Sequence, residues 1–564
     1  MCIRDRIRHR LPFLSWPRLN GPLLHSETFA GLSVGLMVIP QGVAYAALAG
    51  MPLITGIYAS LLPALMAALF SASARLSVGP TALTAMLVSA SLAGMAQPAS
   101  AEWVHLAVWL SLLTGLLQIV LGFARFGWLL NLVSSPVLAA FTQGAAVIIV
   151  SSQLPALLGL TQGWASLLHP GQIHLPSLAF GAVSMAVLML AKRLRPTFPT
   201  VLVVVLGASA LSWGLDLEAQ GAAVVGALPQ GLPALYLPHG LSWEALKQLV
   251  LPTLVITLVS FLETASSAKV DNERKGQRWD QDQDLIGQGL GKIASGLCGA
   301  FPTSSSFSRS ALNLYAGAQT GWATVISVGV ILLALLLFTP VLHHVPQSVL
   351  AAIVLAAVLG LLKPRTFVRL WRVNRIEGAI ALLTFGITLA SAPRLYWGVL
   401  AGVVMGLSYF LHTRLHPRII EVGLHPDGSL RDRHLWRLPP LAERLYALRM
   451  DAELDFAAAS GFERAITEHL SKHHGVRHVC LFAQPINRID VTGVETFAQV
   501  RRQLGAQGIT LHISGIKLPV ETALRRAGEL PDEPGLRLYR TDAETLQALK
   551  QLDPLPHDMA AAAI

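Results

Sequence analysis

Apolar stretches follow one another almost without interruption from Phe29 to Leu411, and this pattern limits the possible folds more than any other feature of the chain. Only 13% of the 564 residues are charged, compared with about 25% in an ordinary soluble domain. The three cysteines lie far apart and match neither a disulfide framework nor a metal motif. The sequence therefore excludes a soluble enzyme and a secreted disulfide scaffold. It predicts a polytopic α-helical membrane protein embedded in a lipid bilayer.

Proline, glycine and polar residues divide this apolar region into fourteen predicted membrane segments. A helix needs about 20 mostly apolar residues to cross the hydrocarbon core, and several of the segments are shorter than that. The predicted spans are 29–49, 51–70, 80–95, 103–122, 131–154, 174–190, 198–214, 248–268, 284–299, 308–317, 321–341, 347–362, 376–392 and 395–411.

The distribution of basic residues agrees with an even number of segments and a cytoplasmic N-terminus. Up to residue 412 the chain has 23 Lys and Arg against 13 Asp and Glu, whereas 19 of each follow. The loop 216–244 has acidic residues but no Lys or Arg, so we expect it outside. Basic cytoplasmic loops explain the pI near 9.8 better than a nucleic-acid partner does. The expected cytoplasmic loops hold Arg75, Arg125 and the basic residues within 192–195, 269–278 and 363–375.

The composition changes after Thr413 to that of a soluble α/β domain, in which predicted strands and helices alternate. We find no glycine-rich phosphate loop and no nucleophile elbow in it, so the sequence predicts neither an enzyme nor a cofactor. The predicted organisation is a basic cytosolic arm 1–26, a transmembrane domain 27–412, a linker 413–438, an α/β domain 439–553 and a mobile tail 554–564.

Two of the predicted segments are broken in a similar way. In the third, a short extended piece, Leu76-Ser77-Val78, meets Gly79-Pro80, and a short helix follows; in the tenth, the polar run 304–306 precedes a helix that begins near Ser308. Each is the third segment of a set of seven. Because an odd repeat inverts its topology, the two half-helices are expected to direct their N-termini at each other in the middle of the membrane.

Two facing helix N-termini favour an anion, because each carries unpaired N–H groups and about half a positive charge. Arg309 adds a full charge inside the membrane, where its insertion costs about 2.5–3.5 kcal/mol or more. Thr81, Ser306 and Ser308 add neutral donors. The alternatives are that these hydroxyls only satisfy the broken backbone, and that Arg309 caps a helix or forms a salt bridge.

Glu263 is the carboxylate that lies well inside an apolar segment, where a charged form is costly. It is a candidate for proton coupling, for Na⁺ binding together with Ser267, or for a structural pairing with Arg309.

Gln41 is a candidate ligand for an oxyanion or a partner of a broken helix. Tyr45, one turn later, is a candidate wall of the site or a core residue. Lys292 is expected to reach the cytoplasmic surface instead of the site.

Several motifs resemble the SulP anion permeases, the sulfate-permease family. The resemblance covers about residues 23 to 552, and the C-terminal part resembles the STAS domain of that family. The sequence departs from the family pattern at Gly291-Lys292, where Ala-Asn is common, and at 304–306, where a glycine is common. The matching motifs are 40–52 (PQGVAYAALAGMP), 77–82 (SVGPTA), 261–264 (FLET), 307–313 (FSRSALN) and 350–353 (LAAI).

The resemblance implies fourteen helices in a seven-plus-seven inverted repeat with core and gate domains, an elevator-like motion, and a homodimer with cytosolic STAS domains. It implies a bacterial inner-membrane carrier of sulfate with proton symport. Bicarbonate or dicarboxylate transport with Na⁺ is one alternative, and an anion channel or charge-sensing protein is another. By position it places the anion near Gln41, Tyr45, Thr81, Ala82, Phe307, Ser308 and Arg309, and it links Glu263 to cation coupling.

Overall fold

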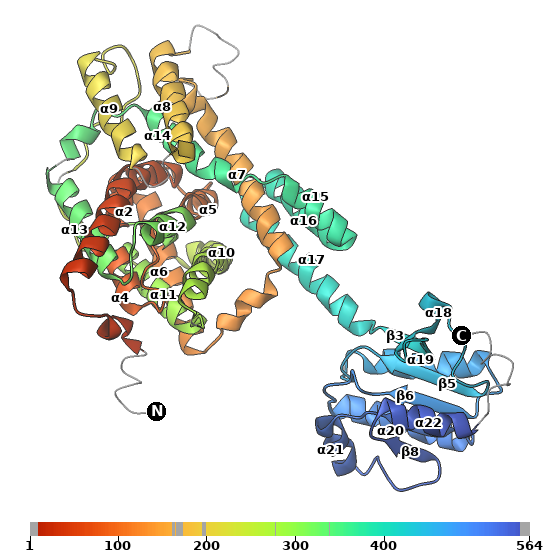
Figure 1. Ribbon diagram of the computed structural model, residues 1–564. Coiled ribbons are helices and arrows are strands. Elements are labelled where there is room, and N and C mark those ends of the chain that lie inside the picture. The colour runs from red at the N-terminus through yellow and green to blue at the C-terminus, as the bar shows by residue number, and fades with distance from the viewer. Residues whose placement is uncertain are drawn as a thin grey trace. The chain divides into compact units, whose positions relative to one another are not determined.

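The computed structural model describes residues 10–160, 164, 173–194, 199–229, 231–276, 278–337 and 339–552. The first nine residues of the expected arm and the expected tail 554–564 lie outside this described part. The chain divides between Gly406 and Leu407 into two compact units, a helical one and a smaller one that contains a sheet (Figure 1).

The helical unit has a helix in each of the fourteen predicted segments. Its short helices include α15, an amphipathic helix that the sequence analysis missed. The helices are α2 (Gly21–Leu48), α3 (Thr55–Tyr58), α4 (Leu62–Phe70), α5 (Ala82–Leu92), α6 (Ala101–Phe123), α7 (Ser135–Leu157), α8 (Leu175–Leu194), α9 (Thr200–Gly214), α10 (Trp243–Lys275), α11 (Gln281–Leu297), α12 (Phe307–Tyr315), α13 (Trp322–Leu337), α14 (Gln347–Val358), α15 (Arg365–Val373), α16 (Arg375–Ala390) and α17 (Tyr396–Leu415), with 3-10 turns η1 (Pro12–Ser15), η2 (Gly127–Leu132), η5 (Thr339–Leu342) and η6 (Leu359–Leu361).

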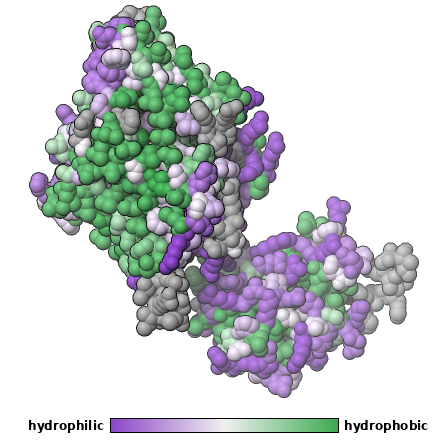
Figure 2. Space-filling model, turned by 60° about the vertical axis from the view of Figure 1, so that its left-hand side comes forward, coloured by the Kyte–Doolittle hydropathy of each residue, from purple (hydrophilic) through white to green (hydrophobic). Residues whose placement is uncertain are grey.

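The surface of the helical unit is suited to lipid. Among the described residues, six helical spans are long and apolar enough to cross a membrane, and further apolar helices are shorter. Figure 2 shows a broad hydrophobic face over this unit and a mainly hydrophilic surface over the smaller one. Large side chains such as Leu116, Leu211 and Leu333 are more than half exposed. An apolar surface of this extent marks a membrane-facing surface.

Two short strands hold the broken segments together. Strand β1 (Val78–Gly79) pairs antiparallel with β2 (Ser304–Ser305), so that Val78 lies opposite Ser305. The pairing satisfies backbone groups that have no water partner at membrane depth. Each strand leads into a half-helix, β1 into α5 and β2 into α12, and the opposite strand directions lead the two half-helices away in opposite directions.

Glycines allow α6 and α11 to pack closely beside this ribbon. A Cβ on Gly115 would lie 2.7 Å from the carbonyl oxygen of Gly289, and a Cβ on Gly289 would lie 2.6 Å from that of Gly115. Small residues of this kind let membrane helices approach backbone to backbone. The approach brings Gln118 of α6 beside Lys292 of α11.

The smaller unit is a six-stranded sheet with the order β4-β3-β5-β6-β7-β8. Strands β5 to β8 are parallel, while β3 is antiparallel to both of its neighbours. The predicted alternation of strands and helices after residue 440 is present. The elements are β3 (Ile419–Leu424), β4 (Leu430–Asp432), α18 (Arg433–Trp436), β5 (Leu445–Met450), α19 (Ala459–Lys472), β6 (His478–Phe482), α20 (Val491–Ala506), β7 (Thr510–Ser514), α21 (Leu518–Arg526), β8 (Leu536–Tyr539) and α22 (Asp542–Leu552).

The stretch 413–438, expected to be a linker, instead contributes two strands to this sheet. Ile420 pairs with Arg449 of β5, and its side chain joins Val422 and Phe482 in a buried cluster. The turn between β3 and β4 contains Asp427-Gly428, a strong hairpin signal. The sequence analysis missed this hairpin because β4 has only three residues and charged residues flank both strands.

Candidate functional site

The N-termini of the two half-helices are capped by their own hydroxyls. Thr81 Oγ1 accepts from the backbone N–H of Thr84 at 3.3 Å, and Ser306 Oγ accepts from that of Arg309 at 3.5 Å. Ser306 and Thr81 therefore have the backbone-satisfying role that the sequence left open as an alternative. Thr81 and Ala82 are buried, whereas Ser308 and Phe307 at the start of α12 are exposed.

Arg309 is 1% exposed and lies between the ribbon and α2. Its Nε donates to Ser77 Oγ at 3.3 Å and its Nη1 to Gln41 Oε1 at 3.4 Å. Its Nη2 has no hydrogen-bond partner within the described structure, and no described carboxylate forms an ion pair with it. Because a buried guanidinium with a free N–H is costly, this geometry favours an incoming anion.

Gly79 of β1 makes room for the free end of this guanidinium. A Cβ at Gly79 would lie 3.3 Å from Arg309 Nη2 and 3.5 Å from Ser60 Oγ. Any side chain at this position would crowd the unpaired N–H group. The absence of a side chain at Gly79 therefore leaves room beside Nη2, which is itself buried.

Glu263 of α10 lies against the tip of α5. Its Oε2 accepts from Thr81 Oγ1 and from Thr84 Oγ1, both at 3.2 Å. Hence its carboxylate pairs with hydroxyls in the first turn of a helix and not with Arg309, unlike the structural pairing considered from the sequence. Ser267 Oγ donates to the backbone carbonyl of Glu263 at 3.3 Å and, within the described structure, forms no hydrogen bond with the carboxylate.

Gln41 and Tyr45 of α2 are both buried beside these elements, at 2% and 4% exposure. The bond from Arg309 gives Gln41 the role of a partner to the broken helix, which was one of its two expected roles. Two hydrogen-bonded pairs, Thr81–Glu263 and Gln41–Arg309, join α5 to α10 and α12 to α2, and the β1–β2 pairing connects them into one network.

Lys292 does not reach the surface, and that prediction is wrong. Its side chain is fully buried, and its Nζ donates to Gln118 Oε1 at 2.9 Å. Gln118 in turn donates to Ser260 Oγ at 3.1 Å, one turn from Glu263 on α10. The signal in the sequence was a pair of polar residues, Lys292 and Gln118, inside two apolar segments.

The sequence analysis also missed buried carboxylates outside the network. Glu27 accepts from the backbone N–H groups of Thr320 at 2.8 Å and Ala323 at 2.7 Å, so it caps the start of α13. Asp284 accepts from the Ser73 hydroxyl at 2.7 Å, and Asp271 pairs with Arg75. These acids link segments of the helical unit to one another, and these partners do not include Arg309 or Gln41.

The fold and these contacts define a multi-pass membrane transporter in which two half-helices lie around the buried side chain of Arg309. The profile described as the sulfate permease family matches residues 24–384, and that of the STAS domain matches residues 440–544. The chain therefore belongs to the sulfate permease family, a family of anion transporters and not of enzymes.

Curated relatives resemble the chain along most of its length. A probable sulfate transporter of Mycobacterium tuberculosis (strain CDC 1551 / Oshkosh) is 32% identical over 538 residues, covering 94% of this chain and 96% of the relative. The probable sulfate transporter 4.2 of Arabidopsis thaliana is 33% identical over 531 residues, covering 89% and 77%.

Among solved structures, the murine Solute Carrier 26 family member A9 anion transporter in the inward-facing state aligns with a TM-score of 0.85 and 20% identity. That alignment covers 98% of this chain and 95% of the other. The transmembrane domain of a cyanobacterial bicarbonate transporter aligns with a TM-score of 0.58 and 20% identity, covering 69% and 99%. At these identities both likenesses concern the fold alone.

Proposed function

We propose that the protein is a secondary active transporter of an inorganic anion, with sulfate as its leading substrate and protons as the coupled ion. The observation that carries this proposal is the buried Arg309, whose Nη2 has no hydrogen-bond partner in the described structure. The names of the mycobacterial and plant relatives support sulfate as the anion. The proposed anion site consists of Gln41, Tyr45, Thr81, Ala82, Ser306, Phe307, Ser308 and Arg309.

Glu263 is the proposed proton carrier, together with its neighbour Ser267. An anion at the half-helix tips and an ionised Glu263 would repel each other. For unit charges roughly 6 Å apart, at an effective dielectric constant of about 20, this repulsion is about 3 kcal/mol. Binding of a proton to Glu263 removes it, so proton and anion favour each other's binding. That mutual preference is the thermodynamic basis of symport.

The movement that we propose is elevator-like alternating access. Hydrogen bonds join α5 to α10 and α12 to α2, and the β1–β2 pairing connects the two half-helices, which supports motion of these elements as one body. We further propose that the helices form a seven-plus-seven repeat with core and gate domains, and that two chains form a homodimer. Basic loops support a bacterial inner-membrane location with the N-terminus and the STAS domain in the cytoplasm.

A second candidate is a Na⁺-coupled carrier of bicarbonate or a dicarboxylate. The two threonine hydroxyls beside the Glu263 carboxylate favour it, since they add oxygen atoms of the kind a hard cation selects. An anion channel is the candidate from another class. A carrier concentrates its substrate against a gradient, and a channel only equilibrates it.

Uptake of radiolabelled sulfate into proteoliposomes separates these candidates. Sulfate should accumulate above its external concentration when the outside is acidic, and a protonophore should abolish the accumulation. Accumulation driven only by a Na⁺ gradient would support the second candidate, and mere equilibration would support a channel.

Arg309→Gln should weaken sulfate binding about 10–100-fold, because one charge-assisted hydrogen bond contributes about 1.5–3 kcal/mol. Arg394→Gln, at an exposed arginine of the same unit, is the matched control and should leave binding unchanged. Equal sulfate affinity in both variants would contradict the site.

A further inference from the structure

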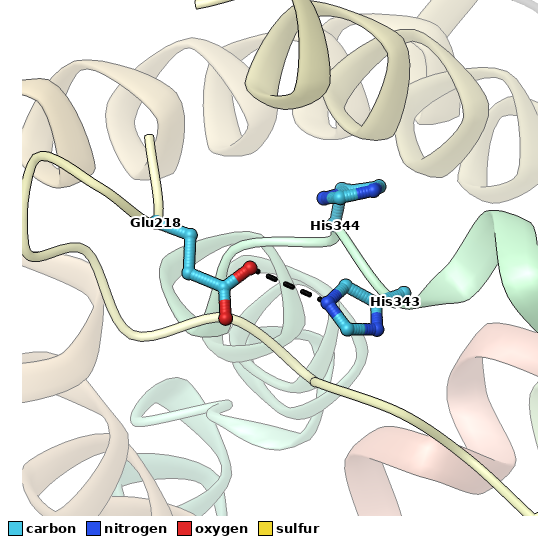
Figure 3. Close-up of side chains that lie close together, drawn as sticks. All are labelled: Glu218, His343 and His344. Atoms are coloured by element: carbon cyan, nitrogen blue, oxygen red, sulfur yellow. Dashed lines mark hydrogen bonds and ion pairs between the residues drawn. The ribbon is translucent and has the colours of Figure 1, made fainter. Parts of the chain in front are cut away.

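A cluster of metal-ligating side chains lies on elements that do not carry the half-helices. Glu218 lies in the turn that follows α9, and His343 and His344 lie in the turn that follows η5. Their ligand atoms all lie within 4.8 Å of one another. Figure 3 shows the Glu218 carboxylate directed at His343, with His344 next to it on the same short segment.

The backbone beneath the cluster is fixed by pairing between the two segments. The N–H of Val225 donates to the carbonyl of Val345 at 2.9 Å, and the N–H of Gly226 donates to that of His343 at 3.0 Å. Leu217, beside Glu218, is 1% exposed, as is Val345. The three ligands therefore extend from backbone that is already held in place, which reduces the cost of ordering them around an ion.

The distances fit a small transition-metal ion. A tetrahedral Zn²⁺ with bonds of about 2.0–2.1 Å separates its ligand atoms by about 3.3 Å. Glu218 Oε2 and His343 Nε2 are 3.3 Å apart. The rings of His343 and His344 have centroids 4.6 Å apart, and the ligand nitrogen of His344 lies within 4.8 Å of the other two ligand atoms, so metal binding requires the second ring to move closer.

The donor set selects the kind of metal. Two imidazoles and one carboxylate suit Zn²⁺, with water in the fourth position, whereas Mg²⁺ and Ca²⁺ prefer oxygen ligands only. We propose that Glu218, His343 and His344 form a Zn²⁺-binding site that links the segment after α9 to the segment before α14. The site is independent of the proposed anion site and of its coupling ion.

Zn²⁺ titration of the purified full-length chain against a chromophoric chelator tests this proposal. The wild type should bind one tightly held Zn²⁺ per chain, and Zn²⁺ but not Mg²⁺ should raise its melting temperature. The double variant Glu218→Gln/His343→Gln should weaken binding at least about tenfold. Both residues are partly exposed. In the presence of a chelator, the variant and the wild type should therefore have the same melting temperature.

The matched control is His473→Gln/His474→Gln, which removes the other adjacent histidine pair of the chain. In the described structure that pair belongs to no group of three metal-ligating side chains. The control should retain wild-type Zn²⁺ affinity. Bound Co²⁺ should give the visible absorption of a four-coordinate site in the wild type and in the control only. Equal Zn²⁺ affinity in the wild type and the Glu218→Gln/His343→Gln variant would overturn the proposal. Glu218 and His343 would then form only an ordinary ion pair.

Discussion

Arg309 places a full positive charge among groups that are themselves electropositive. Its hydrogen bonds go to the neutral acceptors Gln41 and Ser77, and two helix N-termini lie beside it. Burial of a charge that forms no ion pair in the described structure is costly, and an anion beside Arg309 would reduce this cost. This single residue gives the half-helix pair its preference for negative charge.

Glu263 is the residue whose replacement should separate transport from coupling. Glu263→Gln keeps an oxygen that can accept from Thr81 and Thr84 but removes the ionisable group. We expect sulfate exchange to persist while stimulation by an inward proton gradient is lost, as measured by uptake at several imposed pH gradients. Glu244→Gln, at an exposed acid on the same helix, is the control. A full gradient response in Glu263→Gln would remove Glu263 from the coupling step.

The Lys292–Gln118 contact should contribute measurably to stability. Gln118→Leu removes the acceptor of a buried ammonium group, which should reduce the free energy of unfolding by about 1–3 kcal/mol. The double variant Gln118→Leu/Lys292→Met removes both polar partners and should recover more than half of that loss. Thermal melting of the wild type, the two single variants and the double variant in detergent measures the coupling between the two residues. Simple addition of the two single effects would show that the residues do not act as a pair.

At the scale of elements, the broken segments were predictable because proline, glycine and serine interrupt apolar runs in matching positions. The extended leads 76–78 and 304–306 were expected; β2 lies within the second, and β1 overlaps the first at Val78. Their register could not be predicted, since strands of two residues have no periodicity. The partners of Lys292 and Glu27 could not be predicted either, because a single sequence identifies helices but not which helices are neighbours.

Gly79→Ala tests the geometry of the ribbon. The added Cβ would lie 3.3 Å from Arg309 Nη2, so the guanidinium must shift away from the half-helix tips. We expect sulfate affinity to decrease about tenfold while the yield of folded protein changes little. Gly329→Ala, where a Cβ meets nothing within 4 Å, is the control. An unchanged affinity would place the anion away from this strand.

At the scale of the whole molecule, the two units differ in how well their sequence predicted them. In the smaller unit, most elements followed from the regular alternation of strand and helix, and only the β3–β4 hairpin and the short helix α18 were missed. In the helical unit the segments were found, but the amphipathic α15 was not, because Arg369 and Arg372 interrupt the apolar pattern. The buried contacts of both units depend on residues that are distant in the sequence, so they could not be predicted without the structure.

The smaller unit should lose stability in mild acid. Burial and the neighbouring His478 and Arg537 lower the pKa of His512 to about 4. An unfolded histidine has a pKa of about 6.5, so between pH 6.5 and 4 the unfolded state binds more protons and the free energy of unfolding falls, by up to about 3 kcal/mol. Hydrogen exchange of the β6 and β7 amides in the full chain, corrected for the intrinsic rate, should show this loss of protection.

His512→Gln should flatten that pH dependence, whereas His474→Gln, at an exposed histidine, should not. Equal protection of the two strands in the wild type at pH 7 and pH 5 would contradict the role of His512.

The location of a bound heavy anion tests the central claim most directly. Selenate has nearly the shape and charge of sulfate, and its selenium can be located by anomalous diffraction from crystals of the full chain. The account predicts one selenium peak whose oxygens lie within hydrogen-bond distance of Arg309 Nη2 and of the first N–H groups of α12. A well-occupied selenate elsewhere in the helical unit, with Arg309 Nη2 still unpaired, would contradict it.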